Sequence, residues 1–429
     1  MGSMVGALLG GIQSEICGRK KTIMTAQLSS LCGLLFLRFA SSVSMFYIGS
    51  FLGGYAEGVC SVAVALYISE INQPKIRNYT LSFNMVIYFL MFGTTYFLVS
   101  LVSWRQAISI LITLPCICFF SLIVCPESPT WHMLKGRKDV AFAVLIKLRG
   151  NKEAAQMEMN RIDDNLVEQQ LLQSVHCNNV SYIKWQLMII SKQTFLRPCC
   201  VLILLLGIAC QWTGEASLTF YTVTIIQKFK IPVSPYWISA NIGGYQLLVA
   251  LLSVYISAKI PRRKFYMASG VFVILGAGFL GAIVHFQEYD FFVELSRKYP
   301  ILQWLPVPAF MVYYGGYASG YVTVCDMLLG ELLPSNARSL GICIVVQFSN
   351  ISFFVSTKFT PYFVEKLGID GLFCSFSIIA MLSVIFTYLC VPETFGVPLE
   401  EIEEHYRKMC YPRNIKKPIL SIGQSVFPI

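Results

Sequence analysis

Hydrophobic residues along this chain come in long blocks, separated by shorter polar stretches. Most blocks approach or exceed the roughly 20 apolar residues that an α-helix needs to cross a bilayer. The first block is glycine-rich and too short for a full crossing. The pattern predicts an all-α, polytopic membrane protein, because a membrane β-barrel would show short alternating segments instead. About 11 spans are expected, at residues 2–16, 22–40, 45–70, 80–103, 106–125, 198–227, 234–258, 265–286, 302–331, 338–364 and 370–391.

The composition agrees with this interpretation. The chain is 55% hydrophobic and only 13% charged, whereas soluble chains are about 25% charged. Most of the 15 cysteines lie inside apolar runs, where cysteine packs as a small hydrophobe. The four histidines form no cluster, so we expect no metal, no cofactor and no enzyme site. The net charge of +10 fits positive cytosolic loops rather than a nucleic-acid surface.

Basic residues are concentrated in alternate loops, which sets the expected orientation. Placing them in the cytosol by the positive-inside rule puts the N-terminus outside and the C-terminus inside. We therefore expect a multi-pass protein of the cell membrane. The predicted parts are a first transmembrane bundle (1–125), a cytosolic linker with short helices (126–197), a second bundle (198–392) and a cytosolic tail (393–429).

Three charged motifs of the first half return in the same order in the second half. "GRKK" at 18–21 matches "PRRK" at 261–264, "SEINQPKIR" at 69–77 matches "GELLPSNAR" at 330–338, and "PESP" at 126–129 matches "PETF" at 392–395. The ordered recurrence indicates duplication, and duplicated bundles are typical of secondary transporters.

All six motifs fall at predicted cytosolic helix ends, where they could form a network of ion pairs that holds one conformation. The predicted members are Arg19, Glu70, Arg77, Glu127, Arg262, Arg263, Glu331, Arg338 and Glu393. The alternative is that these charges only fix the topology. That alternative leaves the matched acids without a role, since Lys and Arg alone would suffice.

These motifs, together with "PESPTW", "QWTGEASLTFYTV" and "PETFGVPLEEIEEHY", resemble the sugar porter family of the major facilitator superfamily. Within that family the chain is most similar to insect facilitated trehalose transporter-like proteins. The resemblance implies twelve helices in two pseudo-symmetric bundles, with a sugar site between them, and a monomer in the lipid bilayer. This chain begins inside what would be the family's second helix, so we expect an incomplete gene product or a natural short form.

The resemblance also implies which side chains contact substrate. The corresponding positions are Asn84, Met85, Cys210, Gln211, Tyr221, Gln246, Asp326 and Ser349. Several depart from the family's residues: Asp326 replaces a tryptophan on which sugars stack, and Cys210 replaces the first glutamine of a pair. Gln211 and Gln246 keep amides suited to a sugar's hydroxyls. The basic turn after the seventh span has Pro261 where the family has Gly and Ala258 where it has an acid, which should weaken the second charged cluster.

The sequence thus predicts a facilitative carrier for a hexose or a trehalose-like disaccharide, working by alternating access. The alternative is a non-transporting or degenerate relative, either a nutrient sensor or an incomplete gene product. Three acids, Glu57, Glu215 and Asp326, lie at or near membrane depth, where ionisable residues are usually functional. They either face a water-filled cavity and are tolerated, or they mark a changed substrate or coupling to protons.

Overall fold

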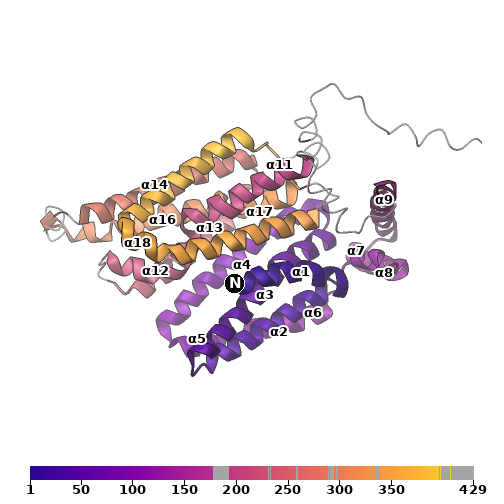
Figure 1. Ribbon diagram of the computed structural model, residues 1–429, viewed down its shortest axis with the longest axis horizontal. Coiled ribbons are helices and arrows are strands. Elements are labelled where there is room, and N and C mark those ends of the chain that lie inside the picture. Colours follow the sequence, from indigo (N-terminus) through magenta and orange to yellow (C-terminus); the bar gives the residue numbers. More distant parts are fainter. Residues whose placement is uncertain are drawn as a thin grey trace, which may run out of the picture.

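The structure, a computed structural model, describes residues 1–176, 193–229, 233–257, 259–287, 298–333 and 338–395, with positions 231, 289, 294–295, 397 and 406. Across these residues the chain is helical and contains no strand. This confirms the all-α prediction. The helices gather into two bundles that lie side by side along the long axis of the molecule (Figure 1).

The first bundle comprises six helices. They are α1 (Gly2–Cys17), α2 (Arg19–Arg38), α3 (Val43–Ile71), α4 (Pro74–Leu101), α5 (Trp104–Leu111) and α6 (Thr113–Val124). Three further helices then lie at one end of the molecule (Figure 1): α7 (Pro129–Leu134), α8 (Lys138–Arg149) and α9 (Lys152–His176). They occupy the segment where short linking helices were expected.

The second bundle contains several interrupted helices. Its elements are α11 (Gln193–Leu202), η1 (Ile203–Ala209), η2 (Gln211–Glu215), α12 (Ala216–Lys228), α13 (Pro235–Ser257), α14 (Arg262–Gln287), η3 (Pro300–Trp304), α16 (Pro306–Gly316), η4 (Tyr317–Tyr321), α17 (Val322–Glu331) and α18 (Arg338–Cys390). In α18, Gly368 has a φ of 75° and separates two helical limbs that run in opposite directions (Figure 1).

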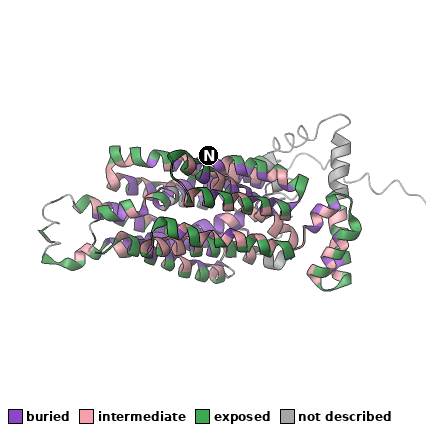
Figure 2. Ribbon diagram, turned by 90° about the horizontal axis from the view of Figure 1, so that it is seen from below, coloured by how far each residue is buried: buried purple, intermediate pink, exposed green. Residues whose placement is uncertain are grey.

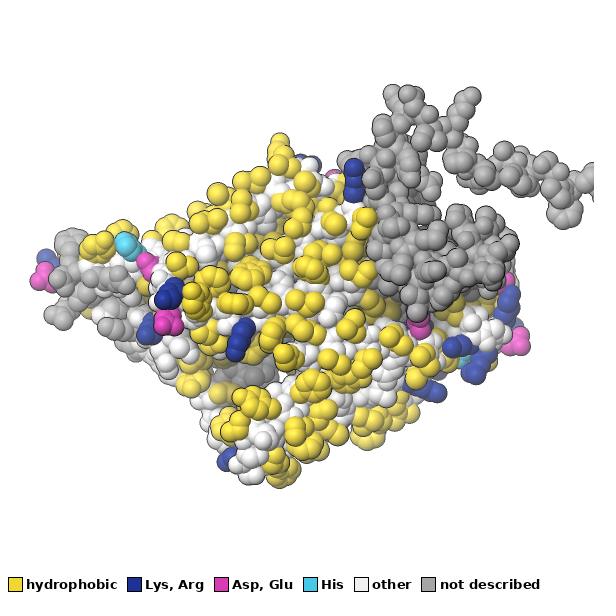
Figure 3. Space-filling view, viewed as in Figure 1, with side chains coloured by type: hydrophobic (Ala, Val, Ile, Leu, Met, Phe, Trp, Pro, Cys, Tyr) yellow, Lys and Arg dark blue, Asp and Glu magenta, His cyan; other side chains and the backbone are white. Residues whose placement is uncertain are grey.

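Among the described residues, seven helical stretches are long and apolar enough to cross a membrane. The longest of them, Gly341–Cys390, holds both limbs of α18, so the number of crossings stays a prediction. Buried residues line the inner faces of the helices and exposed residues the outer faces (Figure 2). Hydrophobic side chains cover the flank of the molecule, and most charged side chains gather at its two ends (Figure 3). This distribution is the one that a bilayer requires.

The two bundles touch most closely where α4 packs along α13. Gly93 and Gly243 face each other at this crossing: a Cβ added to Gly243 would lie 2.5 Å from the Cα of Gly93. Small residues let helix backbones approach in membranes, where packing drives association. A second contact joins α1 to α18, with Asn350 Nδ2 donating to the carbonyl of Ser3 at 3.5 Å.

Candidate functional site

The first half of the chain builds a compact charged cluster around Arg19. Arg19 donates from Nη2 and Nε to Glu70 Oε1, at 2.8 and 3.2 Å. The second oxygen of Glu70 accepts from the hydroxyl of Ser128. Glu127 Oε1 accepts from the backbone N–H of Lys20 at 3.0 Å and from that of Ser128 at 2.9 Å. The cluster therefore joins the first turn of α2, the end of α3 and the segment after α6.

The second half builds the same arrangement around Arg262. Arg262 Nη2 lies 3.6 Å from Glu331 Oε1, and Glu331 Oε2 accepts from the hydroxyl of Thr394 at 2.7 Å. Glu393 accepts from the backbone N–H groups of Arg262 at 2.9 Å and Arg263 at 3.3 Å. The acid, the hydroxyl and the backbone contacts of the first cluster thus each have a counterpart here.

The role of the repeated Pro-Glu motif follows from these contacts. Glu127 and Glu393 lie at the N-terminal turns of α2 and α14, where backbone N–H groups lack intrahelical partners. A carboxylate at that position also meets the positive end of the helix dipole. The first cluster adjoins α7, because Ser128 is the N-cap of that helix. The second cluster follows the C-terminal end of α18, which is directed toward the same end of the molecule (Figure 1).

The distance between the arginine and its carboxylate partner differs between the two clusters. Arg19 makes two hydrogen bonds to one carboxylate oxygen, whereas Arg262 reaches its partner only at 3.6 Å. Arg262 Nε is buried without a hydrogen-bond partner among the described residues. Its Nη1 donates to the carbonyl of Ser257, as that of Arg19 donates to the carbonyl of Ser14, and its guanidinium lies over the ring of Phe395, 5.3 Å from the centroid. The longer ion pair thus belongs to the cluster that has Pro261 where the first half has Gly18.

The remaining predicted members of the network contribute differently. The side chains of Arg77 and Arg338 lie outside the described residues. Arg263 contributes its backbone N–H to Glu393, while its guanidinium lies 4.9 Å from the ring centroid of Tyr388.

Beside the first cluster, α7 carries a titratable side chain. Burial lowers the pKa of His132, and so does Arg137, against the opposite effect of Glu127. His132 is therefore held toward its neutral form near this carboxylate.

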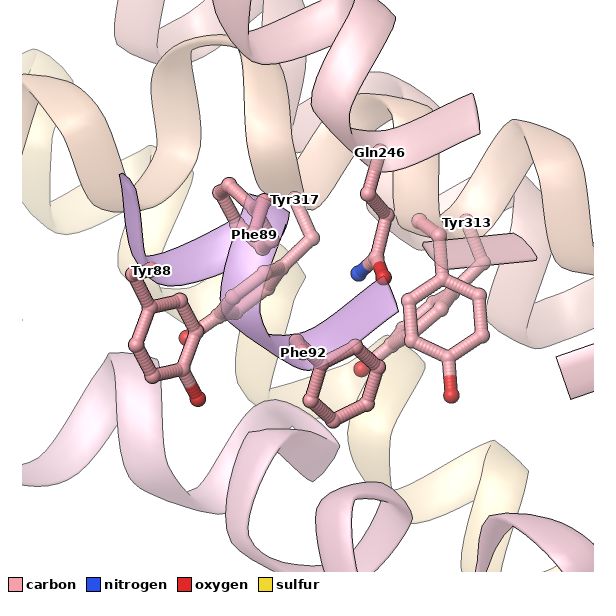
Figure 4. A pocket seen from close by; sticks show the side chains of 7 residues that line it. Tyr88, Phe89, Phe92, Gln246, Tyr313 and Tyr317 are labelled. Atoms are coloured by element: carbon pink, nitrogen blue, oxygen red, sulfur yellow. The ribbon is translucent and has the colours of Figure 1, made fainter. Parts of the chain in front are cut away.

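A small aromatic cavity lies where the two bundles meet. Its walls come from α4, α13, α16 and η4, and its lining residues are Tyr88, Phe89, Phe92, Gln246, Tyr313, Tyr314 and Tyr317. Figure 4 shows the amide of Gln246 directed into the space between the aromatic rings. The volume open to the centre of a water molecule is about 20 Å³, which is room for roughly one water.

Gln246 is the one amide residue that lines this cavity, alongside four tyrosines. Its side chain is 3% exposed, and its Oε1 has no hydrogen-bond partner among the described residues. A buried acceptor left unpaired costs about 1–3 kcal/mol. A hydroxyl or a water entering the cavity would remove that cost.

Gln211, in η2, faces the first limb of α18. Its Nε2 donates to Ser349 Oγ at 3.0 Å, so two predicted substrate residues contact each other. Gln211 Oε1 is buried and also has no partner within the described part of the chain. Its backbone carbonyl accepts from the hydroxyl of Ser356 at 3.3 Å. Polar groups thus continue along the contact between η2 and α18.

The other predicted substrate residues lie apart from the aromatic cavity. Cys210 is buried, with its Sγ 3.7 Å from that of Cys325. Met85 and Tyr221 are partly buried against the hydrophobic core. Asn84 is exposed on α4, and Asp326 is half-buried on α17. Of the eight predicted positions, only Gln246 lines this cavity.

The three acids expected near membrane depth are spread over different elements. Glu57 is exposed on α3, Asp326 lies on α17, and the side chain of Glu215 lies outside the described residues. The choice between tolerated acids and a changed substrate stays a prediction.

The aromatic lining was missed by the sequence analysis. Its signal is present in the runs "YFLMF" at 88–92 and "YYGGY" at 313–317, which place aromatic residues at helical spacing. Nothing in either run separates a cavity wall from ordinary helix packing, because aromatic rings serve both purposes.

Two duplicated bundles, matched charged clusters and a cavity between the bundles define a membrane carrier of the major facilitator type. Residues 1–406 match the family model described as "Sugar (and other) transporter". The chain belongs to this family, which confirms the resemblance found in the sequence.

Curated relatives and solved structures agree with that assignment. The chain is 26% identical to "Facilitated trehalose transporter Tret1" of Culex quinquefasciatus, over 96% of this chain and 76% of the relative. It is 24% identical to the protein of that name from Apis mellifera ligustica, over 95% of this chain and 78% of the relative. These relatives are transporters and not enzymes.

The fold is similar to that of the proton:xylose symporter XylE bound to 6-bromo-6-deoxy-D-glucose. The TM-score is 0.72 at 20% identity, covering 94% of this chain and 87% of that one. The inward open conformation of XylE from E. coli gives a TM-score of 0.67 at 20% identity, with 94% and 86% covered.

Proposed function

We propose that this protein is a facilitative carrier that moves a hexose or a trehalose-like disaccharide across the cell membrane by alternating access. The family assignment and the trehalose transporters among its relatives support sugar as the substrate class. The proposed orientation places the C-terminus and the two charged clusters in the cytosol, following the positive-inside rule. The proposed unit is the monomer.

The unpaired Oε1 of Gln246 in the aromatic cavity carries this proposal. A sugar ring has an apolar face, which packs on aromatic rings, and hydroxyl donors at its rim. The cavity supplies both complements: the rings of α4, α16 and η4, and a buried acceptor on α13. Ligand sites typically combine an apolar wall with a few such polar groups.

The small size of the cavity indicates that it must widen before it can hold a sugar. About 20 Å³ is far below the roughly 300 Å³ at which small-molecule pockets begin. To admit a sugar, the α4 side must therefore move away from α13 and α16. Rocking of one bundle against the other about such a site is the way duplicated carriers work. The clusters around Arg19 and Arg262 would then hold helix ends together as each bundle moves.

The site can be tested by replacing each amide with an apolar side chain of similar size. We expect Gln246→Leu and Gln211→Leu to lower the uptake of labelled glucose and trehalose by at least about tenfold, because each removes a polar contact to the sugar. Gln27→Leu is the matched control, since Gln27 lies within a helix of the first bundle and donates to Cys60 Sγ at 3.6 Å.

Uptake would be measured in proteoliposomes containing equal amounts of folded protein. If both site variants transport as well as the Gln27→Leu protein, the proposed site is wrong. If the unaltered protein binds sugar but does not transport it, the sensor alternative is favoured.

A further inference from the structure

Two thiols face each other inside the second bundle. Cys210 Sγ and Cys325 Sγ lie 3.7 Å apart, and the two residues are 1% and 0% exposed. Cys210 separates η1 from η2, and Cys325 lies in α17. We propose that this pair is a redox modification site, which a peroxide converts to a disulfide joining the η1–η2 segment to α17.

The geometry requires only a short movement. A disulfide has an S–S distance of about 2.05 Å, so the two sulfurs must approach by about 1.6 Å from the 3.7 Å seen here. Both partners adjoin irregular backbone: η1 and η2 flank Cys210, and η4 ends four residues before Cys325. Wide π-helical turns depart from regular helix geometry and often occur at functional sites. These segments are therefore suited to a local shift of this size.

The backbone four residues after Cys210 also departs from regular helix geometry. Gly214 has a φ of 116°, a left-handed conformation that side chains other than glycine's rarely adopt. A Cβ there would also lie 2.7 Å from the Tyr313 hydroxyl oxygen. The bend at Gly214 lets the chain around Cys210 leave the straight path of a transmembrane helix.

The oxidation needs no reactant other than the peroxide. Both sulfurs are buried, so peroxide reaches them only when the η1–η2 segment shifts. One cysteine, as its thiolate, then attacks a peroxide oxygen and becomes a sulfenic acid as the O–O bond breaks, and the thiol proton passes to the departing oxygen. The second thiol attacks that sulfur, and the S–O bond breaks as the disulfide forms. With hydrogen peroxide, the two thiols lose two electrons and two protons in total, and the peroxide leaves as two waters. A dithiol reductant reverses the modification by exchange.

The consequence for transport rests on the proposed function. The segment that holds Cys210 also contacts the cavity wall, because the Tyr313 hydroxyl donates to the Thr213 carbonyl at 2.6 Å. Six residues beyond Cys325, α17 ends at Glu331 of the second charged cluster. A covalent bond between these two segments would hold the cavity wall at Thr213 in one position against α17. It would therefore hinder the widening of the cavity that a sugar requires.

The test uses the full chain in proteoliposomes, treated with hydrogen peroxide and then with N-ethylmaleimide to block free thiols. Peptide mass spectrometry reads the cross-link directly, whether or not the protein transports sugar. We expect a peptide pair joined through Cys210 and Cys325 in the unaltered protein and in Cys374→Ser, an exposed cysteine of α18 that serves as the control. Cys325→Ser should form no such pair.

Uptake is measured on the same samples. We expect peroxide to lower sugar uptake by at least about fivefold in the unaltered and Cys374→Ser proteins, with recovery after dithiothreitol. Cys325→Ser should keep its uptake after peroxide. The proposal is overturned if the peptide pair does not form in the unaltered protein, or if Cys325→Ser is equally sensitive to peroxide. A protein that forms the pair but transports no sugar would contradict the proposed function and leave the modification site standing.

Discussion

Glu127 and Glu393 occupy matching positions in the two charged clusters. Each accepts hydrogen bonds from the backbone at the start of a helix, α2 or α14. Each also stands beside a hydroxyl residue, Ser128 or Thr394, that donates to the buried acid of its cluster. A basic residue in these positions could fix the topology, but it could not accept hydrogen bonds from the backbone N–H groups that have no partner within the helix. The matched acids therefore have a structural use.

The Arg19–Glu70 pair should matter for stability because it is buried. The two side chains are only 5% and 14% exposed, and removing one partner of a buried pair leaves the other charge uncompensated, at a cost of about 3–5 kcal/mol. We predict that Glu70→Gln lowers the thermal unfolding temperature of the detergent-solubilised protein markedly. Unfolding would be followed by the fluorescence of a thiol-reactive dye.

The control for this prediction is an exposed pair. Lys138 Nζ lies 2.7 Å from Asp163 Oδ2, but the side chains are 56% and 38% exposed, and such pairs contribute about 0–1 kcal/mol. Asp163→Asn should leave the unfolding temperature nearly unchanged. Equal shifts for Glu70→Gln and Asp163→Asn would show that burial of the first pair does not decide its strength.

At the scale of elements, hydropathy predicted where most helices lie but not where they break. The span expected at 106–125 is divided between α5 and α6, and the one expected at 302–331 contains η3, η4 and two α-helices. The α-to-π change at η4 alters the backbone hydrogen bonds without changing the apolar character of the side chains, so hydropathy does not reveal it. The break between α5 and α6 does have a signal in the sequence, because Pro115 has no N–H to donate to the carbonyl of Leu111. The break in α18 at Gly368 falls between the expected spans 338–364 and 370–391, where the charged residues Glu365 and Lys366 interrupt the apolar run.

The crossing of α4 and α13 gives a prediction at this scale. A side chain at Gly243 would meet the backbone of Gly93, so it would push the bundles apart where they touch. We predict that Gly243→Val lowers sugar uptake by at least about tenfold while the protein still reaches the membrane. Uptake and surface labelling would be measured together.

The neighbouring glycine provides the comparison. A Cβ at Gly244 would meet no atom within 4 Å, so Gly244→Val should transport normally. The same loss of uptake in both variants would mean that helix propensity, rather than contact between the bundles, is responsible.

For the whole molecule, the duplication was the most informative feature of the sequence. Each half contains both the basic residue and the acids that contact it, in the same order. The residues of the clusters around Arg19 and Arg262 could therefore be predicted from the repeated motifs. The cavity could not, because the walls that Tyr88 and Tyr313 form depend on how α4 meets α16 and η4 across the two bundles. The family's substrate positions predicted Gln246 there, while Cys210 instead packs on Cys325 inside the second bundle.

The proposed facilitative mode leads to a prediction at the same scale. A carrier without coupling equilibrates sugar and cannot concentrate it, whatever the proton gradient. We predict that an acidic exterior does not drive accumulation of labelled sugar in proteoliposomes above the outside concentration. Accumulation that an ionophore abolishes would instead show proton coupling, the mode of the proton:xylose symporter XylE.

The central claim is that this chain carries sugar by alternating access, and counterflow tests it most directly. Proteoliposomes would be preloaded with unlabelled trehalose or glucose, without a pH gradient, and diluted into a trace of the labelled sugar. We predict a transient accumulation of label above equilibrium, because a carrier returns loaded with the internal sugar and so exchanges one molecule for another. The overshoot should be absent in Gln246→Leu. Label that enters without an overshoot, or that does not enter at all, would contradict the account.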